Sequence, residues 1–482
     1  MTTRTGHAPS PTSTRRVPGL VRTLAIACAL ATLTTSHAAC RHPKATVDAS
    51  IKDGTNDSAD GHPGDLISDA LAAQIATEVE AYLTAETEDP SFLQKLDGVY
   101  AGVPFAVFAD AVRARPPKPV LPAAGVHEDS WQNPITARTQ TYSLYVPTGV
   151  AEAAQTGTKD RFPLIVFLHG AGGNGAAIAA DPTIRQAADN EGALLVAPTD
   201  DATICDWSET EDCMSQVVNL VQLIKRRYAI DDRRVVLTGF SMGGRGSFSV
   251  GVAYPEPYCG ITPVAGTIGA VFDDPDLQLH KRYCCPHLQN ADAVRLRYFS
   301  GDQDGQLMLY QNRGCALCLT ESSAEHEYVE VAGQGHVFFA TRWRAAVAWA
   351  LQKPRENFPK TVHRNLSAQA SGINPGGIFL HEKNKVPQYW AEPTGRKDTA
   401  KNGHLAAQVA GQDVTVATKN VTGVTLYLSD DLVDLDLPIH VVVDSKVVHD
   451  GKVPRDAHVL LRQARLRSER AMIFAAKIDI PL

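Results

Sequence analysis

The chain has few aromatic residues and no excess of cationic ones. Aromatic residues make up 7% of its 482 residues, and 46 Lys and Arg face 53 Asp and Glu, which gives a formal charge of −7. Nucleic-acid binding relies on clustered cations that neutralise phosphates, and no basic patch follows residue 40. The composition therefore argues against a nucleic-acid partner, while 44% hydrophobic residues suffice for a sizeable core.

The N-terminal apolar run "LAIACALATL" (24–33) has only ten residues, too few to span a bilayer. Arginines precede it and the small-residue stretch "HAAC" follows it, which is the order of a secretory signal peptide. We therefore predict that residues 1–39 direct export from a bacterial cytoplasm. They carry four arginines and no other Lys, Arg, Asp or Glu, so the chain without them has a formal charge of −11.

Cys40 follows two alanines, a pattern that resembles the lipobox in which a cysteine is lipidated and becomes the mature N-terminus. His37 stands where that pattern usually has Leu, so ordinary cleavage near "SHA" is the alternative. The protein is then either anchored to the cell envelope by lipid or periplasmic or secreted. Residues 40–64 lack apolar periodicity and predict a flexible tether.

Seven cysteines follow Cys40, and in an oxidising compartment they predict disulfides. Cys205 and Cys213 are spaced for a local loop, and the odd number leaves one cysteine unpaired or bridging outward. The alternative is a zinc site built from four of the others, but adjacent cysteines are poor tetrahedral ligands. We predict neither metal nor organic cofactor. The four cysteines of that alternative are Cys284, Cys285, Cys315 and Cys318.

Three patterns follow one another along the rest of the chain. Residues 65–127 have helical periodicity and predict a small helical segment that acts as a lid or a packing brace. In residues 128–352, continuous apolar strands alternate with helices, which indicates a parallel sheet covered on both faces. Residues 353–482 predict a β-sandwich-like domain whose single tryptophan, Trp390, favours structural support or oligomer contact over polysaccharide binding.

The stretch "RVVLTGFSMGG" (234–244) interrupts a strand with Gly-x-Ser-x-Gly just before a helix. This context is typical of a nucleophile elbow, in which a strained serine stands clear of the sheet and glycines avoid clashes. The alternative is a glycine-rich helix start that only packs closely. We interpret Ser241 as a candidate nucleophile.

A serine nucleophile needs a histidine base that a carboxylate orients. Asp304 and His336 each follow a strand-like run downstream. Their chain order, Ser, Asp, His, is the one found in folds that carry such a nucleophile elbow. Asp302 is the other acid in the same loop, and we prefer Asp304. "FLHGAGGNG" (167–175) lacks the Lys of a phosphate loop, so we predict that the N–H groups of Ala171 and Met242 form an oxyanion hole.

The motifs "FPLIVFLHGAGGNG", "CDWSETEDC", "YAIDDRRVVLTGFSMGG" and "AYPEPYCGITPVAGT" resemble those of α/β-hydrolase esterases related to polyhydroxybutyrate depolymerases, feruloyl esterases and acetyl-xylan esterases. The resemblance covers residues 128–352. It implies a Ser241, Asp304 and His336 triad, an acyl pocket near Asp206 and Trp207, and an ester substrate that is either polymeric or an acylated carbohydrate. His169 is expected to brace its loop.

Two other functions stay open at this point. A serine peptidase of the prolyl-oligopeptidase type shares the elbow and the triad, but a propeller or extra binding domain is expected with it and none is evident upstream. A non-catalytic cell-surface binding protein would have no need of Ser241 and His336 in this order.

Overall fold

The computed structural model describes residues 67–114, 121–134, 137–200, 206–208, 210–268, 274–319, 325–366 and 388–482. They belong to one compact unit, residues 65–482. The predicted signal peptide, Cys40, the tether and Cys205 lie outside the described residues. Within the described ranges, no helix has both the length and the apolarity needed to cross a membrane.

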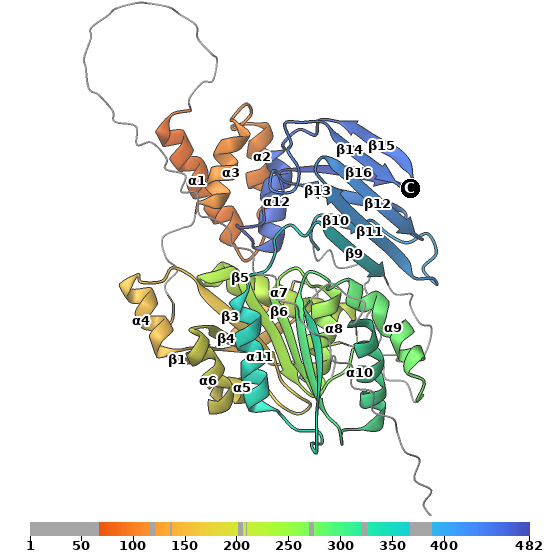
Figure 1. Cartoon of the computed structure of the whole chain (residues 1–482). Helices are drawn as coiled ribbons and strands as arrows, with labels where there is room; N and C mark the ends of the chain where they lie inside the picture. Colours follow the sequence, from red (N-terminus) through yellow and green to blue (C-terminus); the bar gives the residue numbers. More distant parts are fainter. Residues whose placement is uncertain are drawn as a thin grey trace, which may run out of the picture. The chain divides into compact units, whose positions relative to one another are not determined.

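An eight-stranded sheet forms the centre of the first and larger part of this unit (Figure 1). Its strand order is β1-β2-β4-β3-β5-β6-β7-β8, with β3 to β8 parallel and β1 and β2 antiparallel to their neighbours. β3 and β4 are buried along their whole length, as their continuous apolar sequences predict. The predicted α/β-hydrolase fold is confirmed. The strands are β1 Gly125–Gln132, β2 Thr139–Val146, β3 Phe162–Leu168, β4 Leu194–Pro198, β5 Ile230–Phe240, β6 Gly260–Val264, β7 Arg295–Gly301 and β8 His326–Val331.

Helices cover both faces of this sheet because alternate strand residues point to opposite faces. Leu164 and Val166 of β3 belong to an apolar cluster with residues of α7 and α8, whereas Ile165 and Phe167 pack with residues of α6 and α11. The helices of this part are α4 Thr148–Thr156, α5 Gly175–Ala180, α6 Pro182–Glu191, α7 Glu211–Arg227, α8 Met242–Ala253, α9 Leu277–Gln289, α10 Gln306–Leu319 and α11 Ala340–Gln352.

The three N-terminal helices, α1 Asp69–Thr84, α2 Ser91–Asp97 and α3 Phe105–Arg113, pack on α12 Ala457–Arg467 of the C-terminal domain. Glu86, in the loop between α1 and α2, also pairs with Arg227 at the C-terminal end of α7, with a guanidinium to carboxylate distance of 2.6 Å. That end of α7 precedes the start of β5, so it lies away from the carboxyl ends of the strands. Of the two predicted roles, the contacts support the packing brace and not the lid. β1 begins at Gly125, inside the segment predicted to be helical.

The C-terminal domain consists of two sheets that enclose one apolar core, as predicted. Trp390 is fully buried in this core and its indole N–H donates to the Pro359 carbonyl at 2.7 Å, so it offers no aromatic platform at the surface. The five-stranded sheet has the order β15-β14-β12-β11-β9 and the other has β10-β13-β16. The strands are β9 Thr361–Leu366, β10 Ala391–Pro393, β11 Gly403–Ala410, β12 Asp413–Lys419, β13 Gly423–Leu428, β14 Ile439–Val443, β15 Lys446–Gly451 and β16 Ala476–Pro481.

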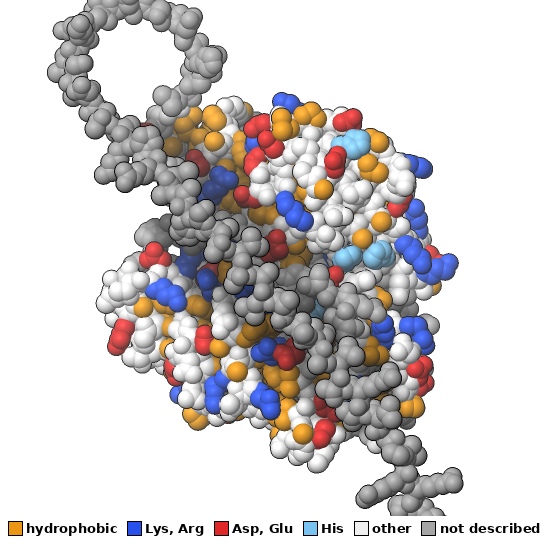
Figure 2. All heavy atoms as spheres, in the orientation of Figure 1, with side chains coloured by type: hydrophobic (Ala, Val, Ile, Leu, Met, Phe, Trp, Pro, Cys, Tyr) orange, Lys and Arg blue, Asp and Glu red, His pale blue; other side chains and the backbone are white. Residues whose placement is uncertain are grey.

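Buried ion pairs join the C-terminal domain to the α/β-hydrolase domain. Across the boundary, Glu469 lies 3.3 Å from Lys225 and Arg467 lies 3.1 Å from Glu256, and Glu469 also accepts at 2.8 Å from Arg355, at the start of the C-terminal segment. All five side chains are at most 4% exposed. Where described side chains are visible at the surface in Figure 2, cationic and anionic groups are interspersed.

Candidate active site

Ser241 occupies the sharp turn between β5 and α8. Its backbone has φ 58° and ψ −116°, a region that non-glycine residues rarely adopt. The flanking glycines are required by close approach, because a Cβ on Gly239 would overlap the Gly243 carbonyl and one on Gly243 would overlap the Leu168 carbonyl. The Ser241 N–H donates to the Val264 carbonyl at 3.0 Å, which ties the strained residue to β6.

His336 lies in the loop between β8 and α11, with its imidazole beside Ser241. Its Nε2 atom is 2.8 Å from the Ser241 hydroxyl oxygen. The side chain is 41% exposed, and the Phe240 ring packs against it with 5.3 Å between ring centroids. The imidazole therefore has one supported face and access to solvent.

Asp304 faces the other imidazole nitrogen of His336. Both carboxylate oxygens lie 3.1 Å from Nδ1, and the carboxyl is 3% exposed. With Nδ1–H donating to Asp304, Nε2 is free to accept the hydroxyl proton of Ser241. The structure places Asp304 and not Asp302 against His336, since the Asp302 carboxylate accepts the Gln334 N–H at 3.2 Å.

The loops that carry Asp304 and His336 are bonded to each other. The Gln303 N–H donates to the Gln334 carbonyl at 2.8 Å. Gly301 makes this approach possible, because a Cβ there would overlap the Gln334 and Gly335 carbonyls. The distance between the Asp304 carboxylate and the His336 ring is thus set by two backbone segments in direct contact.

The glycine-rich loop after β3 lies against the elbow. A Cβ on Gly170 would lie 3.5 Å from the Ser241 Cβ, and Gly173 N–H donates to the Gly170 carbonyl at 3.0 Å. Within the described part of the chain, neither the Ala171 N–H nor the Met242 N–H has an intramolecular acceptor. These two predicted donors therefore belong to two segments in contact beside Ser241.

His169 is buried and braces this loop, as expected. Its Nδ1 lies 2.8 Å from the Gly170 carbonyl, and its Nε2 accepts the Asp200 N–H at 3.2 Å. Trp207, predicted to lie near an acyl pocket, is 1% exposed and its indole N–H donates to the His169 carbonyl at 3.0 Å. Through this hydrogen bond, Trp207 holds the start of the glycine-rich loop.

The sequence reasoning missed the partner of Asp206. Arg245 lies one helical turn after Ser241, and its guanidinium is 3.3 Å from the Asp206 carboxylate. Its backbone N–H donates to the Ser241 carbonyl at 2.9 Å. One feature of the sequence could have placed Arg245 near the site: it lies four residues after Ser241, and helical residues four apart lie on one face.

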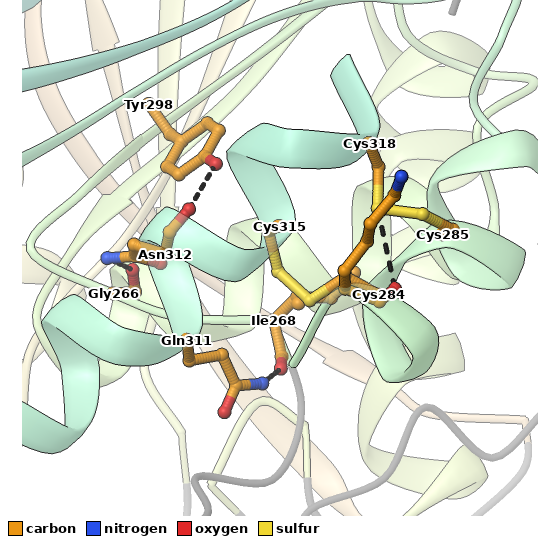
Figure 3. Close-up of a disulfide and its surroundings, with 10 residues drawn as sticks. Gly266, Ile268, Cys284, Cys285, Tyr298, Gln311, Asn312, Cys315 and Cys318 are labelled. Atoms are coloured by element: carbon orange, nitrogen blue, oxygen red, sulfur yellow. Dashed lines mark hydrogen bonds between the residues drawn. A yellow bond between two sulfur atoms is a disulfide. The ribbon is translucent and has the colours of Figure 1, made fainter. Parts of the chain in front are cut away.

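The four cysteines of the zinc alternative form two disulfides, so that alternative is wrong: their thiolates are not available as ligands. Cys284 pairs with Cys315 and Cys285 pairs with Cys318, joining α9 to α10 (Figure 3). No group of His, Cys, Asp or Glu within the described ranges is arranged to hold a metal ion. Cys213 is disulfide-bonded, and Cys205, its predicted partner, lies outside the described residues.

Cys259 is the free cysteine of the described residues, in line with the odd number. Burial raises the pKa of its thiol to about 12, so the thiol stays protonated and unreactive.

Solved structures similar to this chain are esterases and related hydrolases. A thermostable esterase is 20% identical and has a TM-score of 0.37, with 48% of this chain and 63% of that protein covered. The chain thus spans less than two thirds of that esterase. A ferulic acid esterase is 14% identical with a TM-score of 0.39, over 48% of this chain and 98% of the esterase.

An S-formylglutathione hydrolase from Agrobacterium tumefaciens is 18% identical with a TM-score of 0.38, over 48% of this chain and 97% of that enzyme. No protein-family model matches the chain, and a search of curated proteins found no match.

Proposed function

We propose that the protein is a serine hydrolase that cleaves carboxylic esters. One observation carries this proposal: a single hydrogen-bonded series runs from the Ser241 hydroxyl through His336 to the buried Asp304 carboxylate, starting at a strained turn. A residue in a sparsely populated backbone region costs of the order of 1–3 kcal/mol, which a merely structural serine would not need.

Each residue of the series has a defined task in acyl transfer. His336 Nε2 takes the hydroxyl proton while Ser241 Oγ attacks the ester carbonyl carbon, and the Asp304 carboxylate holds Nδ1–H and offsets the imidazolium charge. Ala171 and Met242 N–H groups donate to the carbonyl oxygen as it gains charge, and the positive end of α8 adds to this.

Collapse of the tetrahedral intermediate breaks the ester bond and leaves an acyl group on Ser241. The imidazolium returns its proton to the leaving alkoxide, which departs as the alcohol. Water then enters, and His336 removes its proton while the hydroxide oxygen attacks the acyl carbon. The second intermediate collapses, the imidazolium returns the proton to Ser241 Oγ, and the acid is released. Every proton in this scheme moves through Nε2, which is the nitrogen that faces Ser241.

We also propose that the protein works outside the cytoplasm, as the leader-like N-terminus suggests. Two disulfides join α9 to α10 and a third involves Cys213. Disulfides persist in exported proteins and are rare in reducing compartments, which supports export. Detection of the mature chain in the envelope or medium fraction, with or without lipid on Cys40, tests this.

The decisive experiment compares Ser241→Ala with Ser247→Ala. Ser247 is a buried serine of α8, the helix that follows Ser241, and its hydroxyl donates to the Gly244 carbonyl at 3.0 Å, so it controls for loss of a hydroxyl. Purified proteins are treated with a fluorophosphonate and assayed with nitrophenyl esters of increasing acyl length. We expect labelling and hydrolysis in the wild type and Ser247→Ala, and neither in Ser241→Ala. Labelling and hydrolysis that persist without Ser241 would refute the proposal.

A further inference from the structure

Asp304 is positioned by the helix that follows it. α10 begins at Gln306, and its first turn is already bonded to the Asp304 loop, because the Met308 N–H donates to the Gly305 carbonyl at 2.9 Å. The Gly305 N–H donates to the Asp304 carboxylate at 2.8 Å. A displacement of α10 would therefore move the carboxylate away from His336.

Hydrogen bonds tie α10 to the segment that follows β6. Gln311 donates to the Ile268 carbonyl, and Asn312 donates to the Gly266 carbonyl at 3.2 Å (Figure 3). Tyr298 of β7 donates to the Asn312 carbonyl at 2.9 Å. Both amide side chains are fully buried. Since β6 also accepts the Ser241 N–H, one stretch of chain contacts both the elbow and the acid-bearing helix.

α9 holds α10 covalently. Cys315 and Cys318 lie three residues apart, on one face of α10, and adjacent cysteines of α9 pair with them. α9 has little apolar surface of its own with which to pack: besides Cys284, Leu288 is its fully buried apolar side chain, and Pro286 interrupts its backbone hydrogen bonding. The disulfides supply the attachment that apolar burial does not.

An ion pair holds α10 to the sheet edge. Arg313 donates through Nε to Glu330 of β8 at 2.8 Å and through a second N–H to the other carboxylate oxygen. Hydrogen bonding to Arg313 is the main cause that holds the pKa of Glu330 below its ordinary value. Two parallel N–H bonds fix geometry better than a single contact does.

We propose that the α9–α10 disulfides and the Arg313–Glu330 pair act as positioning elements for the triad acid, so that catalysis depends on them through Asp304. This inference rests on the proposed function. Removing either element lets α10 move and lengthens the contact between the Asp304 carboxylate and His336. Because a misplacement of about 1 Å can cost about 100-fold in rate, kcat is the quantity that responds.

Two sets of variants test this with a nitrophenyl ester. The first set contains two double variants, each of which removes one disulfide: Cys284→Ala with Cys315→Ala, and Cys285→Ala with Cys318→Ala. The second is Arg313→Gln, which leaves all cysteines intact and changes a half-exposed side chain, so that folding is retained. Its matched control is Arg297→Gln, because Arg297 of β7 pairs with Glu327 of β8 at 2.6 Å and lies over the Trp349 ring of α11.

We expect kcat to fall about tenfold to 100-fold in the disulfide variants and Arg313→Gln, with KM nearly unchanged, and Arg297→Gln to match the wild type. Each variant is repeated in the Asp304→Asn background. There, loss of the disulfides or of Arg313 is expected to cause no further decrease in kcat, because the group that they position no longer acts.

Equal losses of kcat with and without Asp304 would overturn the inference, since the elements would then act on folding alone. An unchanged kcat in the soluble, folded Arg313→Gln protein and in the disulfide variants would overturn it as well. Either result leaves Ser241-dependent hydrolysis by the wild type intact. Failure of the proposed function is distinguishable, because the wild type itself would then show no Ser241-dependent hydrolysis.

Discussion

The Nδ1 atom of His336 lies 3.1 Å from each carboxylate oxygen of Asp304. A symmetric contact of this kind orients the imidazole plane and fixes the tautomer in which Nε2 accepts a proton from Ser241. The next acid in the loop, Asp302, bonds to backbone instead. The two aspartates therefore offer a matched pair for mutagenesis.

Asp304→Asn is expected to lower kcat about 10⁴-fold, because an amide in place of the carboxylate favours the wrong imidazole tautomer. Asp302→Asn keeps an amide oxygen that can accept the Gln334 N–H and is expected to change kcat less than tenfold. Steady-state kinetics on the same ester measures both. A larger loss in Asp302→Asn than in Asp304→Asn would reverse the assignment of the triad acid.

Gly243→Ala tests the close approach at the elbow. The new Cβ would overlap the Leu168 and His169 carbonyls, so we expect a loss of about 3 kcal/mol or more in the free energy of unfolding, together with reduced labelling of Ser241. Gly149→Ala is the control, because no atom lies within 4 Å of a Cβ there and alanine suits the α4 helix. Denaturant unfolding that shows equal stability for the two variants would contradict this reading of the turn.

Because His287 of α9 is buried, we predict that the free energy of unfolding of the protein decreases in acid. Burial lowers the pKa of its imidazole from 6.5 to about 4. Between these values the unfolded chain binds more protons than the folded one, so folding stability is lost as pH falls below 6.5, by about 3 kcal/mol near pH 4.

His287→Phe keeps a buried ring beside Tyr283, whose ring centroid lies 5.3 Å from that of His287. We expect the variant to lose this part of the pH dependence in denaturant titrations, whereas His458→Gln, a change at a more exposed histidine, should keep it. An unaltered acid slope in His287→Phe would show that His287 does not carry the effect.

We predict that the ion pairs of buried Glu469 help to hold the C-terminal domain on the α/β-hydrolase domain. Burial alone opposes its ionisation, but Lys225 and Arg355 outweigh burial and hold the pKa of this carboxyl well below its ordinary value. Glu469→Gln leaves the buried Arg355 guanidinium without this carboxylate and leaves Lys225 with Asp232 alone, at 3.9 Å, so we expect a loss of about 3–5 kcal/mol in the free energy of unfolding at neutral pH.

Asp398→Asn provides the surface comparison, because Asp398 and Lys401 form an exposed pair at 3.0 Å whose loss should change stability little. The pKa of Glu469 is lower in the folded protein than in the unfolded chain. Its contribution to the free energy of unfolding is therefore present above the ordinary pKa of a glutamate and is lost as pH falls. The difference in stability between wild type and Glu469→Gln should therefore shrink in acid. A difference that grows in acid would contradict the ion-pair account.

Much of the fold could be read from local patterns. Strands such as 162–168 are continuous apolar runs, and glycines flank Ser241 where the strand gives way to a helix, so the parallel sheet and the elbow follow from side-chain period and backbone freedom. The order Ser241, Asp304, His336 was also visible, because each residue lies in the loop or turn that follows a strand. The sequence analysis preferred Asp304, but Asp302 has the same neighbours in sequence, so the local pattern could not show which carboxylate contacts His336.

The sequence by itself thus determined the strand ends that carry Ser241, Asp304 and His336, because periodicity and glycine placement act over a few residues. Tertiary structure alone decided that Asp304 reaches His336, that adjacent cysteines pair across α9 and α10, and that the N-terminal helices brace α12. Those contacts join residues distant in the chain, and only the packing of whole elements sets the distances between them.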